Sequence, residues 1–211
     1  MSAGERLCGH CQAELATVRC HGCFSLELAG GKHCAQCGAT LGLEGIEGPL
    51  DMSCPRCEQA QLLGILVGEH HVGECLRCTG LFVTHEALER MTRRHEQDAG
   101  IRLRPLPAAV TAPETRAYLR CPQCREHMNR KNFGERSGVI VDVCATHGVW
   151  FDRDELARAL EFIDAGGLSR LTERDRVVTS IRRLHDTHRP DASALGSYDM
   201  VGSFLISLLG K

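Results

Sequence analysis

Two segments of the chain repeat one pattern of closely spaced cysteines, and this repeat constrains the fold more than any other feature. In the first segment, two Cys-x-x-Cys pairs are separated by 17 residues; in the second, the separation is 19 residues and the last ligand position is histidine. Zinc takes four thiolate or imidazole ligands in a tetrahedron, and a tight turn with two ligands supplies half of them. The intervening length suits a β-hairpin that returns the chain. The predicted zinc ligands are Cys54, Cys57, Cys75 and Cys78 in the first copy, and Cys121, Cys124, Cys144 and His147 in the second.

His147 occupies the place that Cys78 has in the first copy. Thiolate and imidazole share little besides the capacity to bind a metal, so the exchange itself indicates a ligand position. The repetition of the whole pattern argues against a chance arrangement.

Composition favours a fold that metal stabilises. Only 4% of the 211 residues are aromatic, which argues against one large core, and 22 glycines suit tight turns. Units of about 40 residues usually need metal or disulfides in addition to burial. The first residues lack the pattern of a signal peptide, so we expect a cytoplasmic, reducing location in which cysteines bind metal. No apolar run reaches the ~18 residues of a membrane span, and the net charge of −2 argues against a general polyanion binder.

Six cysteines near the N-terminus remain, and four of them form a third predicted set. Ten residues separate its two pairs, Gly30 and Gly31 supply a turn, and Gly38 follows where a knuckle needs an unhindered backbone. The segment resembles the short zinc ribbon of bacterial proteins. The predicted ligands are Cys20, Cys23, Cys34 and Cys37. A rival allocation groups Cys8 and Cys11 with Cys20 and Cys23 across an eight-residue spacing and leaves Cys34 and Cys37 over.

Cys8 and Cys11 have no assigned partners in the preferred allocation. They could be a vestigial reduced pair near a terminus. They could instead bind metal together with His10, His21 or a second chain, or act as a redox-active dithiol. Three zinc ions are therefore the expected content, one for each complete set.

Residues 54–90 and 121–160 resemble the zinc-ribbon family named after the zinc-binding domain of transcription factor IIB. The family pattern is Cys-Pro-x-Cys, a strand pair, a second knuckle, an aromatic Trp-Leu-Asp segment and a helix. Phe82 stands in the Trp position of the first copy, and Trp150-Phe151-Asp152 follows the second, which is one residue shorter at this point. The resemblance implies zinc ribbons; it does not imply a general transcription factor, because such ribbons serve many roles.

The expected fold is a small metal-stabilised α+β protein of tandem zinc ribbons, with a helix after each of the last two. Thr84 is a predicted N-cap for the first helix, while Asp152 and Glu155 form a predicted capping box for the second, which Gly166 and Gly167 end. The predicted units are an N-terminal ribbon (1–45), a ribbon with helix (52–98), a Pro-rich linker (99–117), a second ribbon with helix (118–167), a helix (168–190) and a linker with an apolar docking tail (191–211).

Function is less constrained than fold. Four protein ligands close each site, so we expect structural zinc rather than an enzyme, and no catalytic motif stands out. The preferred hypothesis is an adaptor that binds a protein partner or itself through residues 199–211, where seven large apolar side chains crowd ten positions. The same tail could instead fold back onto the body of the chain as a last helix. The alternatives are a nucleic-acid-binding or transcription-associated protein and a redox- or metal-responsive one.

Basic residues support the nucleic-acid alternative only weakly. Residues 90–104 carry five Arg against two acids, and residues 116–131 carry four Arg and one Lys against one acid. We expect weak, non-specific binding at most, because such faces are usually solvated helix and linker surfaces. His70 and His71 are expected at a hairpin tip, exposed to solvent, and Trp150 and Phe151 between hairpin and helix.

Overall fold

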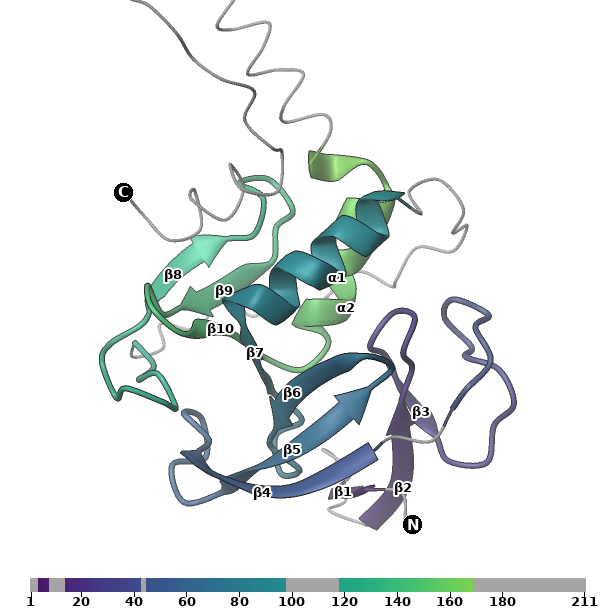
Figure 1. Ribbon diagram of the computed structural model, residues 1–211, viewed down its shortest axis with the longest axis horizontal. Helices are drawn as coiled ribbons and strands as arrows, with labels where there is room; N and C mark the ends of the chain where they lie inside the picture. The colour runs from purple at the N-terminus through teal and green to yellow at the C-terminus, as the bar shows by residue number, and fades with distance from the viewer. Residues whose placement is uncertain (1–3, 8–13, 43–44, 98–117, 169–211) are drawn as a thin grey trace, which may run out of the picture.

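The protein is described by a computed structural model that covers residues 4–7, 14–42, 45–97 and 118–168. Within these ranges the chain forms a three-stranded sheet, a seven-stranded sheet and two helices (Figure 1). The small sheet has the order β1-β2-β3 and consists of β1 (Gly4–Leu7), β2 (Glu14–Arg19) and β3 (Leu26–Leu28). Its strands are antiparallel, and it carries the first pair of cysteines in the loop between β2 and β3.

The large sheet contains both repeats and is antiparallel throughout, in the order β4-β5-β6-β7-β10-β9-β8. The strands of the first repeat are β4 (Gly45–Ser53), β5 (Gln61–Val67), β6 (His70–Glu74) and β7 (Leu81–Thr84). Those of the second are β8 (Asn129–Asn132), β9 (Ile140–Val143) and β10 (Gly148–Phe151). The repeats therefore meet edge to edge, through the strand that follows the second knuckle of each.

The pairing of β7 with β10 relates the two repeats by a local two-fold axis. Phe82 pairs with Trp150, its counterpart in the repeat, while Leu81 pairs with Phe151 and Val83 with Val149. Phe82 thus faces its own counterpart, while Leu81 faces the counterpart of Val83 and Val83 faces that of Leu81, as in an isologous dimer interface. The two repeats form one body, which the separate sequence motifs do not reveal.

Each repeat contributes one helix to the same side of the sheet. The helices α1 (His85–Gln97) and α2 (Glu155–Asp164) lie against each other over the junction of the repeats (Figure 1). Between them, His95 Nδ1 lies 2.7 Å from Asp164 Oδ1, and both side chains are buried. Since the helices enclose a core built from both repeats, neither repeat has a complete core of its own.

That core also receives one side chain from the N-terminal unit. Phe24, which follows Cys23, is buried with Ile65, Val67 and Val72 of the second unit. The N-terminal zinc unit is therefore docked on the large sheet by apolar packing as well as by chain connection.

The predicted fold class is confirmed: the described residues form an α+β fold with three cysteine-rich clusters. Thr84 caps α1, because its Oγ1 accepts a hydrogen bond from the backbone N–H of Ala87 at 3.2 Å. The Pro-rich linker, the predicted C-terminal helix (168–190) and the apolar tail (191–211) lie outside the described residues, apart from Leu168 at the start of that helix. Among the described residues, no helix has the length and apolar character needed to cross a membrane.

Two local expectations need correction. The capping box at α2 is only half formed: Glu155 accepts a hydrogen bond from the Asp152 backbone N–H at 2.7 Å, but Asp154 is the N-cap and the Asp152 carboxylate has other partners. The exposure expected for the hairpin-tip histidines is wrong for His70, which is buried beside Phe24, and right for His71. In both cases a contact distant in sequence decides the orientation of the side chain.

Candidate metal centres

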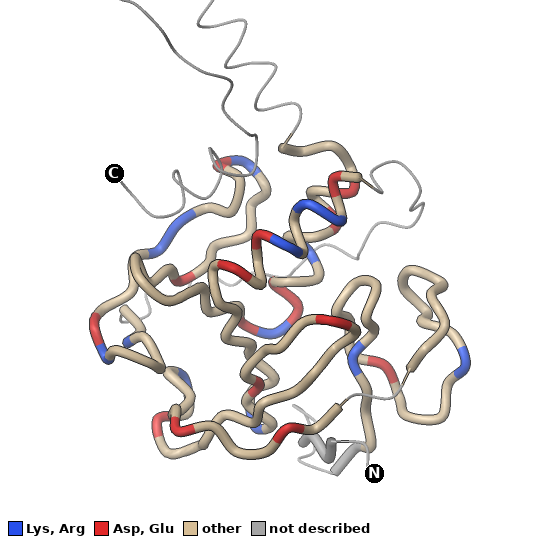
Figure 2. The backbone as a smooth tube through the Cα atoms, in the orientation of Figure 1, with Lys and Arg blue, Asp and Glu red and all other residues tan. Residues whose placement is uncertain are grey.

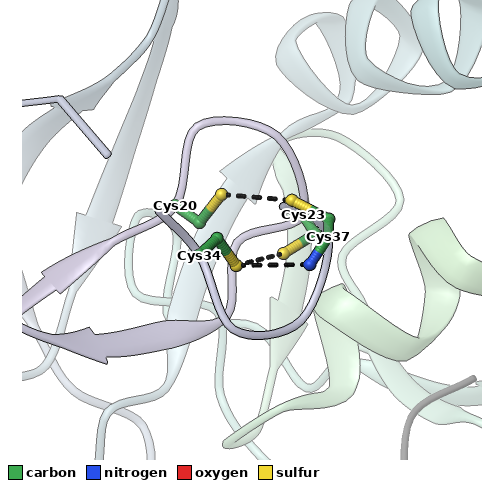
Figure 3. A group of neighbouring side chains, drawn as sticks. All are labelled: Cys20, Cys23, Cys34 and Cys37. Carbon is green, nitrogen blue, oxygen red and sulfur yellow. Dashed lines mark hydrogen bonds between the residues drawn. The ribbon is translucent and has the colours of Figure 1, made fainter. Parts of the chain in front are cut away.

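The structure brings together three sets of four potential metal ligands. Within each set, the ligand atoms all lie within 4.8 Å of one another. The sets are site 1 (Cys20, Cys23, Cys34 and Cys37), site 2 (Cys54, Cys57, Cys75 and Cys78) and site 3 (Cys121, Cys124, Cys144 and His147). Figure 3 shows the four sulfur atoms of site 1 turned toward a common centre. These groups correspond to the allocation preferred from the sequence, and Cys8 and Cys11 lie outside the described residues.

The spacing of the ligand atoms fits zinc. A tetrahedral ion with Zn–S bonds of about 2.3 Å separates its sulfur ligands by about 3.8 Å. The Sγ atoms of Cys23 and Cys34 are 3.6 Å apart in site 1. The corresponding distances are 3.9 Å between Cys57 and Cys75 in site 2 and 3.7 Å between Cys124 and Cys144 in site 3. All 11 described cysteines are free thiols. The prediction of three sites that can hold three zinc ions is therefore confirmed.

In site 3, the imidazole of His147 enters through Nδ1. This atom lies 3.5 Å from Cys144 Sγ and 3.9 Å from Cys121 Sγ. Nδ1 is thus the nitrogen placed to bind the ion, as expected when imidazole replaces the thiolate of Cys78.

The thiols of each site interact so closely that they cannot ionise independently. In site 2, hydrogen bonds from Cys54 and Cys78 lower the pKa of Cys75 to about 2, while the hydrogen bond to Cys75 raises the pKa of Cys54 to about 12. One thiolate is therefore stabilised by protons on its neighbours. A divalent cation at the centre would replace those protons and allow all four ligands to bind as anions.

Five of the six knuckles share one backbone conformation. The residue after the second ligand has a positive φ, and its N–H donates to the carbonyl of the first ligand at 2.8–3.0 Å. These residues are Phe24, Gly38, Glu58, Thr79 and Arg125. The turn holds the two ligand side chains of the knuckle on one side, which positions them for the same ion.

The sixth knuckle, Cys144 to His147, lacks this residue. Gly148 comes directly after the last ligand and already belongs to β10, and its carbonyl accepts the hydrogen bond from the Cys144 N–H at 2.9 Å. Gly148 is also closely packed, since a Cβ there would lie 2.3 Å from the carbonyl oxygen of Val83. The one-residue deletion seen in the sequence is therefore the loss of the left-handed residue.

A buried ion pair fastens site 1 to site 2. Arg19, next to Cys20, donates from Nε and Nη2 to Glu74 Oε1 at 3.0 and 2.7 Å, and from Nη2 to the carbonyl of Thr79 at 2.7 Å. Glu74 precedes Cys75, so this pair joins the entrance of one knuckle to that of another. Both side chains are at most 2% exposed, which makes the loss of either partner costly.

A second ion pair joins site 2 to the repeat that carries site 3. Arg56 lies inside the first knuckle of site 2 and forms a two-bond pair with Asp152, with Nε to Oδ1 at 2.8 Å and Nη2 to Oδ2. The same Oδ1 accepts a hydrogen bond from Trp150 Nε1 at 3.0 Å. Trp150 is fully buried in a cluster that includes ligands of both sites, among them Cys54 and Cys144.

His85, at the start of α1, contacts site 3 from the other repeat. Its Nε2 lies 2.7 Å from the carbonyl oxygen of Cys144, and its backbone N–H donates to the carbonyl of His147 at 3.3 Å. Sequence reasoning did not identify the roles of His85, Arg19 or Arg56. The sequence signal that could have identified these residues is their position, next to a predicted ligand or at the start of a helix.

The arginines of the possible basic stripe are largely paired with acids in the described part of the chain. Along α1, Arg90 pairs with Glu86 and Arg93 with Glu89, while Arg94 pairs with Glu69. Figure 2 shows basic and acidic positions interleaved along this helix. Near site 3, Arg130 lies 3.5 Å from Asp142 and over the ring of exposed Tyr118.

Three zinc sites on β-hairpins define a tandem zinc-ribbon architecture. Residues 120–161 match the family model described as Transcription factor zinc-finger. The match includes all four ligands of site 3, β8 to β10 and most of α2, so the family resemblance is confirmed for this segment. No curated protein and no solved structure matches the chain.

Proposed function

We propose that the protein is a non-enzymatic zinc-stabilised adaptor that acts through protein–protein contacts. The observation that carries this proposal is the closed ligand set of each of the three sites in the described residues. Four protein ligands fill a tetrahedral ion, whereas a catalytic zinc ion usually has three and keeps a position for water or substrate. The zinc ions would therefore stabilise surfaces rather than perform chemistry.

Rigid connections between the sites support the same function. The Arg19–Glu74 pair, the Arg56–Asp152 pair and the β7–β10 junction hold the three zinc units in one arrangement. Preorganised surfaces lose less entropy on binding a partner, which suits a scaffold. Trp150 and Phe151 are fully buried, so they stabilise this scaffold and are not exposed contacts.

The experiment compares partner binding by the full chain and by a chain without residues 199–211. We expect captured partners or self-association to be lost on deletion, while zinc content stays unchanged. A point variant with Phe204, Leu205 and Leu208 replaced by serine should behave like the deletion. A matched variant with Ser203 and Ser207 replaced by alanine should bind normally. Unchanged binding after the deletion would remove the support that the tail gives to this proposal.

A transcription-associated role with nucleic-acid contact is the second candidate. The match of residues 120–161 to a family of transcription factor zinc fingers favours it, as does the exposed Tyr118 beside Arg130. Phosphate contacts would make affinity fall steeply with salt. We expect only weak, salt-sensitive binding; a sequence-specific complex that survives moderate salt would favour this candidate over the adaptor.

A further inference from the structure

Sites 2 and 3 lie at opposite ends of the paired strands β7 and β10 and are connected by side chains as well as by these strands. The Arg56 guanidinium belongs to a knuckle of site 2, while its partner Asp152 directly follows β10, the strand that begins next to His147. Such a connection couples metal binding at the two sites only if its strength depends on whether the sites are occupied.

Arg56 lies within a knuckle whose two cysteines would bind metal at site 2. Cys54 and Cys57 are held in one turn by the backbone hydrogen bond from the Glu58 N–H to the Cys54 carbonyl at 2.8 Å, and a metal ion at site 2 would fix their side chains. Small zinc sites fold and bind together, so loss of the ion releases the knuckle. The guanidinium would then lose the geometry that allows two parallel hydrogen bonds to Asp152.

Asp152 in turn positions residues at site 3. Its Oδ1 holds the indole N–H of Trp150, the single tryptophan of the chain, at 3.0 Å. Trp150 shares a buried cluster with Cys121 and Cys144, two ligands of site 3. Release of Asp152 would therefore remove the hydrogen bond that orients a large side chain packed at that site.

We propose that zinc binding at sites 2 and 3 is positively coupled, and that the Arg56–Asp152 pair transmits the coupling. Arg56 and Asp152 are positioning residues, since neither supplies a ligand atom. Coupling between binding sites is reciprocal, so metal at site 3 favours metal at site 2 by the same factor. At partial loading, the singly loaded forms of these repeats are then less populated than they would be with independent sites.

The test measures the zinc affinity of site 3 in the full-length chain, with site 2 intact and with site 2 disabled by Cys57→Ser. Competition with a chelator, followed by thiol alkylation and mass spectrometry, reports protection of Cys121 and Cys124 separately from the other sites. We expect Cys57→Ser to lower the affinity of site 3 at least about fivefold, the lower end of typical coupling. An unchanged affinity would overturn the proposal.

The pathway is tested by repeating the comparison with Arg56→Gln. In this background, Cys57→Ser should change the affinity of site 3 less than about twofold. Arg77→Gln is the matched control, because Arg77 has the same place in the other knuckle of site 2 but is exposed; it should keep the full effect. An undiminished effect with Arg56→Gln would assign the coupling to the shared sheet and contradict the role of the pair.

Two further measurements test the Asp152 side of the pair and the reciprocity of the coupling. Asp152→Asn removes the charge from the other side and should reduce the coupling as Arg56→Gln does. His147→Ala should lower the affinity of site 2 by the same factor that Cys57→Ser lowers that of site 3, as linkage requires. If both pair variants also prevented zinc loading of site 1, the pair would hold the fold in general and the proposal would fail.

Discussion

A left-handed residue closes five of the six knuckles, and glycine fills this position only at Gly38. The φ angle of this residue is 76° at Gly38 and 51° at Glu58. Glycine enters this region at no steric cost. A side chain in this conformation costs roughly 1–2 kcal/mol. The metal and the hydrogen bonds of the knuckle must offset this cost at the four other positions.

Gly38→Ala should therefore weaken site 1. A Cβ at Gly38 would meet no atom within 4 Å, so the expected loss of about 1 kcal/mol in the free energy of unfolding comes from the backbone alone. Gly42→Ala is the matched control, because it is equally open but has no positive φ. Chelator-induced release of zinc from site 1 measures the effect of each substitution. Equal effects of Gly38→Ala and Gly42→Ala would contradict the role assigned to the left-handed residue.

His147 tests the exchange of one ligand type for another. His147→Cys should keep zinc and fold, because it restores the ligand set of site 2. His147→Ala should lose zinc at site 3 and expose residues 121–165 to hydrogen exchange and proteolysis, since binding and folding are coupled. Full zinc content with unchanged protection in His147→Ala would show that this residue is not a ligand.

Glu155 should make stability depend on pH. Burial, and then the charge of Asp152, raise the pKa of the Glu155 carboxyl from 4.5 to about 8. Between these values the folded state binds more protons than the unfolded state, so the free energy of unfolding falls as pH rises through the window. Glu155→Gln keeps an acceptor for the Asp152 N–H and should flatten this fall between pH 4.5 and about 8. Parallel pH profiles of the two proteins in chemical unfolding would argue against the raised pKa.

At the scale of elements, the β7–β10 junction depends on a glycine. A Cβ at Gly80 would lie 2.2 Å from Cζ2 of Trp150, whose ring is fully buried and fixed by its hydrogen bond to Asp152. Gly80 directly precedes β7, and the indole of Trp150 can lie against this end of the junction only because the side chain is absent.

Gly80→Ala should therefore destabilise both repeats, by about 1–3 kcal/mol as in other overpacked cores. Thermal unfolding measures the loss. Combining Gly80→Ala with Trp150→Phe should cost less than the sum of the two single changes, because the smaller ring leaves room for the added methyl group. Additive effects would show that the clash is relieved elsewhere.

The elements that sequence reasoning predicted are those with local signals. Ligand spacing predicts the knuckles and hairpins, and Thr84 and the glycine pair mark helix ends correctly. Pairing of β7 with β10 has no local signal, because it joins strands more than 60 residues apart. Asp152 has the sequence of a helix cap, yet Arg56 lies 96 residues away and takes its carboxylate. Long-range partners of this kind also explain the burial of His70.

On the scale of the whole molecule, the zinc units form a linked series. Arg19 joins site 1 to site 2, Arg56 joins site 2 to the repeat of site 3, and His85 returns from the first repeat to the Cys144 carbonyl. The stability of each unit therefore depends on contacts with its neighbours, because a chain with few aromatic residues cannot give each unit a large core of its own.

Removal of the Arg19–Glu74 pair tests this dependence. Arg19→Met should leave Glu74 buried without its cation and cost about 3–5 kcal/mol, whereas Arg19→Met with Glu74→Leu should recover much of the loss. Zinc retention at sites 1 and 2 under chelator competition, with unfolding in denaturant, follows both variants. No recovery in the double variant would mean that the ion pair is needed for specific docking and not only for charge balance.

The central claim is that three closed zinc sites organise this chain, and zinc stoichiometry tests it most directly. Native mass spectrometry of the reduced full-length protein, supported by elemental analysis, counts the bound ions. The account predicts three zinc ions per chain, with the 12 assigned ligand residues protected. Four ions would show that Cys8 and Cys11 recruit further ligands. Two or fewer ions, or cysteines paired in disulfides, would contradict the account.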